Sequence, residues 1–121
     1  MADLHEDLRR LVGKAGHWTE VRYHARRGRA LGVMKGEVVE MSSQHTEGVG
    51  LRVLIDGTWG FAATSDLDPR GLERALTRAE AMARALASVK RKKARLAEGG
   101  ELARGDYLVP GYEELDEMPL E

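Results

Sequence analysis

The feature that most constrains the fold is an alternating apolar run that leads through an Asp-Gly pair into a second run. The first run has an aliphatic residue at every second position: Val49, Leu51, Val53 and Ile55. This is the period of a strand with one buried face. Asp56-Gly57 separates it from residues 58–63. Because a type I′ turn needs positive φ at both central residues, Asp-Gly is one of its favoured pairs, and the segment predicts an antiparallel β-hairpin.

Three further strands are predicted before this hairpin. Residues 18–26 alternate apolar and polar side chains, Arg27-Gly28 offers a turn, and residues 30–35 continue as a second strand. Lys35-Gly36 offers another turn before a third strand at residues 37–44. Tight turns favour antiparallel neighbours. We therefore expect five strands in a meander.

Helices are predicted on both sides of the strands. Residues 3–15 carry leucines at helical spacing, with Asp3 able to cap the start. Asp68-Pro69 is a favourable start for a second helix. Its apolar stripe consists of Leu72, Ala75, Leu76, Ala79, Met82, Ala83, Leu86 and Val89. We expect this helix to end at Gly99-Gly100. The expected fold class is α+β: a five-stranded, largely antiparallel sheet flanked by a short N-terminal and a long C-terminal helix, both on one face.

The distribution of charge divides the chain into two parts. Residues 1–98 hold 18 basic and 13 acidic residues, whereas residues 99–121 hold 1 basic and 7 acidic residues. We expect a folded domain at 1–98 and an acidic tail or linker at 99–121. The chain has no cysteine, which excludes disulfides and thiolate zinc sites. No apolar run approaches the roughly 20 residues of a membrane helix, and the acidic start is unlike a secretory signal. A cytoplasmic location is expected.

The sequence predicts no catalytic residue and no metal ligand. His5-Glu6 opens like a zinc-protease motif, but Leu8, Arg9 and Arg10 stand where the second histidine is needed. His24 and His45 could be cross-strand neighbours that hold a metal together with Glu20 or Glu47, although histidines on a polar sheet surface more often have no such role. Hydroxyl and carboxylate side chains near the second helix are better explained as turn and cap residues.

Two surfaces are candidates for binding. Gly48, Gly50 and Gly60 lie within and between strands, where glycine permits close approach of another backbone, so an extended peptide or a second protein could pack there. The other candidate is a basic cluster at the expected end of the long helix: Lys90, Arg91, Lys92, Lys93 and Arg95. This cluster lacks interleaved aromatic residues and is more typical of a solvated helix end than of a nucleic-acid site.

The segment from Gly48 to Leu67, GVGLRVLIDGTWGFAATSDL, resembles the N-terminal domain of the TldD/PmbA metallopeptidase family. Residues 18–22 and 35–40 resemble two earlier parts of that domain, so the resemblance covers roughly residues 15–90. The resemblance implies an α/β domain that precedes a separate β-rich catalytic domain. The family includes zinc-dependent peptidases, some of which were once described as modulators of DNA gyrase. Its zinc motif matches no position here, so we expect zinc only in the catalytic domain and no cofactor in this chain.

The resemblance also implies partners. Family members form homodimers or heterodimers, so we expect a TldD/PmbA-type catalytic domain or chain as partner, with a homodimer as the other form. The function expected is that of a non-catalytic domain that contributes contacts to a peptide cleft or a dimer. The residues expected to make them are Arg52, Trp59 and Phe61, with Gly48, Gly50 and Gly60 beside them. The alternative is a nucleic-acid-binding module that uses the basic cluster.

Overall fold

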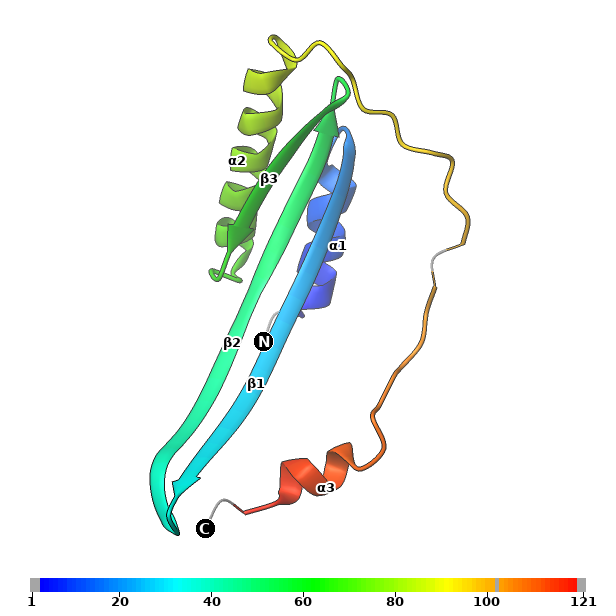
Figure 1. The fold of residues 1–121 in the computed structure, drawn as a ribbon. Helices are drawn as coiled ribbons and strands as arrows, with labels where there is room; N and C mark the ends of the chain where they lie inside the picture. Colours follow the sequence, from blue (N-terminus) through cyan, green and yellow to red (C-terminus); the bar gives the residue numbers. More distant parts are fainter. Residues whose placement is uncertain (1–2, 102, 120–121) are drawn as a thin grey trace. The chain divides into compact units, whose positions relative to one another are not determined.

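The computed structural model describes residues 3–101 and 103–119. The elements follow in the order α1 (Leu4–Lys14), β1 (Trp18–Met34), β2 (Glu37–Ile55), β3 (Thr58–Thr64), α2 (Pro69–Ala87) and α3 (Tyr112–Glu117) (Figure 1). The three strands form one sheet in the order β1-β2-β3. The chain divides into two compact units, residues 1–28 with 43–95 and residues 29–42 with 96–121.

The expectation of five strands is wrong: the sheet has three antiparallel strands, because two of the expected breaks do not occur. The residues with positive φ in the two hairpin turns are Lys35, Gly36, Asp56 and Gly57. A two-residue turn of this kind needs positive φ at both central positions. Gly28 has no such φ, so β1 continues through it. Similarly, β2 continues through Gly48, which lets the strands approach closely: a Cβ there would lie 3.2 Å from the carbonyl oxygen of Thr64.

The expectation of a long C-terminal helix is also wrong. The helix that follows the sheet, α2, ends at Ala87, with Ser88 as its C-cap. Instead, the chain turns back onto the β2–β3 hairpin, where the amide of Ala94 donates to the carbonyl of Gly57 at 2.7 Å, and the amine of Lys93 donates to the carbonyl of Ala87. The segment expected to be an acidic tail or linker, residues 99–121, contains the short helix α3.

Both main helices begin as predicted. The Asp68 carboxylate accepts from the amide of Gly71 at 2.6 Å, and Pro69 occupies the first turn of α2. The Asp3 carboxylate accepts from the amide of His5 at the start of α1. These bonds satisfy backbone amides that have no partner within the helix.

One core joins both helices to the sheet. Its buried apolar side chains are Leu11 of α1, Val49, Leu51 and Val53 of β2, and Leu72, Ala75, Leu76, Ala79 and Ala83 of α2. The three β2 residues alternate, so they share one face of the strand. The helices therefore cover this face of the sheet, and the other face of the β2–β3 hairpin is left open (Figure 1).

Candidate interaction site

The open face of the sheet carries three of the residues that the sequence singled out for binding: Arg52, Trp59 and Phe61. In the β2–β3 register, Arg52 pairs with Phe61 and Leu54 pairs with Trp59. These positions alternate with the buried residues of β2, so their side chains point away from the helices. Phe61, the one phenylalanine of the chain, is 55% exposed.

Arg52 lies at the centre of a cluster on this face. Its guanidinium donates to the carboxylate of Glu20 on β1 at 2.7 Å. The guanidinium carbon lies 5.5 Å from the ring centroid of Trp18 and 5.2 Å from that of Trp59. Both distances suit a cation–π interaction. The arginine is therefore held in place by three side chains from two strands.

Aromatic rings extend the cluster across β3. The rings of Trp18 and Trp59 meet edge to face with centroids 5.5 Å apart. Trp59 and Phe61 are stacked at 6.4 Å. Trp18, Glu20, Arg52, Trp59 and Phe61 are called the aromatic–arginine cluster below. Its two tryptophans are the only ones in the sequence.

The three glycines expected to form a smooth surface do not share one. A Cβ on Gly50 would meet nothing within 4 Å, which fits an open position on the face of Arg52. Gly48 is partly buried beside the end of β3. Gly60 pairs with the buried Val53 and lies under α2, where a Cβ would come within 1.9 Å of the carbonyl oxygen of Ala79. The structure therefore places Gly60 on the helix-covered face.

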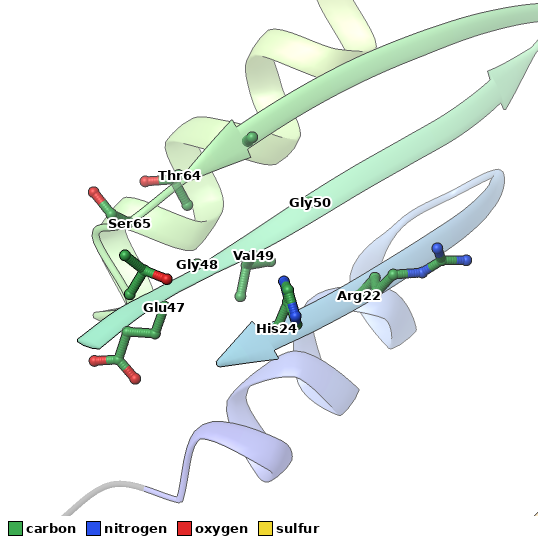
Figure 2. A pocket seen from close by; sticks show the side chains of 10 residues that line it. Arg22, His24, Glu47, Gly48, Val49, Gly50, Thr64 and Ser65 are labelled. Atoms are coloured by element: carbon green, nitrogen blue, oxygen red, sulfur yellow. The ribbon is translucent and has the colours of Figure 1, made fainter. Parts of the chain in front are cut away.

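Two neighbouring hollows border the cluster and share Arg22, Gly50 and Ala63. One includes Glu20, Arg52 and Phe61 in its lining. The other extends to the end of β3, where Figure 2 shows Arg22 and His24 from β1, residues 47–50 from β2, and Thr64 and Ser65. The surface beside the cluster is therefore concave and has a floor of small residues.

Polar side chains gather near the second hollow around Glu47. Its carboxylate accepts a hydrogen bond from the phenol of Tyr23 at 2.8 Å, and the Nε2 of His45 lies 3.8 Å away. The hydrogen bond to Glu47, with some desolvation and the charge of the same carboxylate, raises the pKa of Tyr23 above its ordinary value. Among residues 3–101 and 103–119, no group of three or more His, Cys, Asp or Glu side chains could hold a metal ion. His5 and Glu6, the start of a zinc-protease motif, lie on α1.

The basic residues Lys90, Arg91, Lys92, Lys93 and Arg95 follow α2 as an irregular, exposed segment. The amine of Lys93 is engaged by the carbonyl of Ala87. Trp18 and Glu20 were not among the residues predicted to bind. Their alternating positions at the start of β1 indicate that the two side chains share one face of the strand. Their contact with Arg52, however, depends on the strand register.

None of the described helices is long and apolar enough to cross a membrane.

One comparison with known proteins gave a match, and the matched residues include parts of the sheet and of α2. The family model described as PmbA/TldA metallopeptidase domain 1 matches residues 19–83, which is more than half of the chain. The match runs from the second residue of β1 to the last buried alanine of α2. Searches of curated proteins and of solved structures gave no match. The chain therefore belongs to the TldD/PmbA metallopeptidase family, through the first domain of that family.

Proposed function

We propose that the chain acts as a non-catalytic first domain of a TldD/PmbA-type zinc metallopeptidase. In this role it contributes contacts to a peptide cleft or a dimer, formed with a separate catalytic domain or partner chain. The observation that carries the proposal is the aromatic–arginine cluster on the open sheet face. The proposal places the zinc in the catalytic partner and the protein in the cytoplasm.

The composition of the cluster supports a role in association. Tryptophan, tyrosine and arginine are enriched among the residues that dominate the energetics of protein interfaces, and aromatic side chains bury large areas there. Trp18 is 39% exposed and Phe61 is 55% exposed, so a partner has apolar area left to cover. Glu20 and the two indole rings already hold the guanidinium of Arg52. The entropic cost of ordering this side chain on binding is therefore reduced.

The proposal assigns the chain itself no role in metal-assisted hydrolysis, and the available metal ligands support this assignment. Catalytic zinc is usually bound by three protein ligands drawn from His, Cys, Asp and Glu. The described part of the chain offers no group of that size. The peptide-bond chemistry is therefore assigned to the partner, and the contribution of this chain is to bind and orient.

The test is affinity purification of the tagged chain from its source extract, with identification of the bound proteins by mass spectrometry. Arg52→Glu removes the cation from the cluster, and Arg95→Glu makes the same charge change in the basic segment. We expect a zinc-motif member of the family to be recovered with the wild type and with Arg95→Glu, and to be lost with Arg52→Glu. Because a glutamate at position 52 would face Glu20, Phe61→Ala serves as a second variant that leaves the charges unchanged.

The nucleic-acid alternative makes the opposite prediction. It requires that Arg95→Glu reduces recovery and that Arg52→Glu does not. It also requires retention on DNA that falls steeply with added salt, because binding to phosphates releases counterions. The structure does not favour this alternative, since residues 90–95 are not part of α2 and the amine of Lys93 bonds to the protein backbone.

A further inference from the structure

The end of α2 carries exposed apolar side chains. Met82 and Leu86 are exposed, and Val89 is 72% exposed. The amides of Val89 and Lys90 both donate to the carbonyl of Leu86, so a helical turn continues past Ala87, the last residue of α2. Residues three or four positions apart on a helix are neighbours on its surface. Met82, Leu86 and Val89 therefore lie in one row, called the exposed patch below.

The exposed patch is separate from the core. The residues that α2 buries against the sheet are others, and Met82 reaches only the edge of β3, where its sulfur accepts from the amide of Phe61 at 3.5 Å. An exposed apolar patch rimmed by polar residues is typical of a surface that contacts another protein or a membrane. The chemistry of the rim then indicates which kind of partner fits.

The rim is strongly basic. Residues 81–97 contain six lysine or arginine residues and no aspartate or glutamate: Arg84, Lys90, Arg91, Lys92, Lys93 and Arg95. All six are exposed. The ion pairs of lysine and arginine in the described part of the chain involve Arg10, Lys14, Arg22, Arg52, Arg74 and Arg84, and none involves residues 90–95. The positive charge after α2 therefore attracts anions from outside the chain.

Tertiary contacts hold the basic residues beside the exposed patch. The amide of Ala94 donates to the carbonyl of Gly57 in the turn between β2 and β3 (Figure 1). A Cβ on Gly57 would lie 2.6 Å from the Cβ of Lys93, so the segment packs closely against this turn. The turn adds one acidic residue, Asp56, to the surroundings. Residues 90–95 therefore stay at the end of the unit at which α2 ends.

The combination of apolar and basic side chains distinguishes between anionic ligands. Nucleic acids are bound mainly through their phosphates, and single strands also stack on aromatic rings, which residues 81–97 lack. An anionic bilayer attracts cations as well, and it also takes up apolar side chains between its headgroups. The exposure of Val89 beside the basic residues therefore favours a lipid surface.

We propose that the exposed patch and residues 90–95 form a peripheral binding site for an anionic lipid surface. Leu86 and Val89 insert between the headgroups, and Lys90, Arg91 and Lys92 contact the anionic groups around them. The apolar area is small, so binding is reversible and is weakened by salt. The proposal goes beyond the proposed function and is independent of it, because Arg52 and Phe61 are not part of this surface.

The test is co-sedimentation of the full chain with lipid vesicles. One set consists of phosphatidylcholine alone, and the other of phosphatidylcholine with phosphatidylserine in a ratio of roughly two to one, which gives a negative surface. We expect binding to the second set alone, with an affinity that falls as salt is added. Equal binding to both sets, or no binding to the phosphatidylserine vesicles at low salt, would overturn the proposal.

A pair of charge variants tests the role of the basic residues. Lys90→Gln with Lys92→Gln should weaken binding by about twentyfold, because each basic residue near an anionic surface contributes about fivefold in affinity. Arg26→Gln with Arg27→Gln removes the same charge from exposed positions of β1 and should leave the affinity nearly unchanged. Equal losses in the two variants would mean that only net charge matters, which contradicts a site at the end of α2.

A second pair tests the insertion of the exposed patch. Val89→Ser should weaken binding by about threefold or more, because the binding strength scales with the apolar area buried. Val38→Ser changes a valine of β2 that is 59% exposed and should have no effect. Every substituted side chain is exposed, so none of the variants removes a core contact.

The second pair also separates lipid from nucleic acid. If Val89→Ser binds the phosphatidylserine vesicles as tightly as the wild type, the surface attracts anions by charge alone and the lipid proposal is wrong. Retention of both proteins on DNA would then identify nucleic acid as the ligand of residues 90–95. Recovery of a zinc-motif partner through Arg52 is measured separately, so either proposal can fail without the other.

Discussion

At the scale of single residues, glycines in neighbouring strands serve different purposes. Gly60 lets α2 approach the sheet, since any Cβ there would overlap the carbonyl oxygen of Ala79. Gly50 faces open space on the other side of the sheet. The sequence does not distinguish them, because both lie in alternating runs of similar composition. The difference arises from the face each residue occupies and from the helix packed against that face.

The glycines provide a matched pair of variants. Gly60→Ala should lower the free energy of unfolding by about 1–3 kcal/mol, because the added methyl group pushes α2 away from the sheet. Gly50→Ala adds the same methyl group where nothing is displaced and should leave the stability nearly unchanged. Urea denaturation followed by tryptophan fluorescence measures both. Equal effects of the two substitutions would contradict the close packing of α2 on β3.

The phenol of Tyr23 provides a second prediction at this scale. Its pKa is raised chiefly by the hydrogen bond to Glu47, so the folded protein holds this proton more tightly than the unfolded chain. The resulting stabilisation is present below the ordinary tyrosine pKa of about 10 and is lost as the pH rises through the raised value. Glu47→Gln should bring the pKa of Tyr23 down towards its ordinary value.

Phenolate absorbance, recorded while the pH is raised, checks this prediction. The other two tyrosines, Tyr107 and Tyr112, are replaced by phenylalanine so that Tyr23 alone titrates. If the titration curve in that background is the same with and without the Glu47→Gln substitution, the carboxylate of Glu47 is not the cause of the shift.

At the scale of the elements, the sequence predicts where helices start better than where strands and helices end. Asp3 and Asp68 cap α1 and α2 as predicted, because a side-chain cap is a local interaction. The alternation at residues 49–55 also predicted correctly which residues of β2 face the core. The strand number was wrong because Arg27-Gly28 looks like a turn in sequence, whereas the backbone at Gly28 stays extended. The length of α2 was wrong because a tertiary contact between Ala94 and Gly57 redirects the chain.

The cap of α2 can be tested directly. Asp68→Ala removes the acceptor for the amide of Gly71 and should cost about 0.5–2 kcal/mol of stability. Asp68→Asn keeps an acceptor of similar shape and should retain most of the stability. Asp106→Ala, at an exposed aspartate outside the helices, is the control. Thermal unfolding followed by circular dichroism measures all three, and a destabilisation by Asp106→Ala as large as that by Asp68→Ala would show that the cap is not responsible.

At the scale of the whole molecule, the site depends on residues that are distant in sequence. Arg52, Trp59 and Phe61 were predicted, because they follow one another on a recognisable hairpin. Trp18 and Glu20 come from β1, and nothing local to them indicates that they meet Arg52. The aromatic–arginine cluster therefore exists only once the sheet has formed. Under the function proposed above, this preformed surface serves to bind a partner.

The most direct test of this account is the affinity of the purified chain for the zinc-motif partner recovered with it, measured by isothermal titration calorimetry. Phe61→Ala removes an exposed ring of the cluster, and Val89→Ala removes an exposed side chain, 72% accessible, beyond the end of α2. We predict that Phe61→Ala raises the Kd by roughly tenfold or more, as expected for a residue at the centre of an interface, and that Val89→Ala leaves it unchanged. An unchanged Kd for Phe61→Ala would contradict the assignment of the open sheet face as the surface of association.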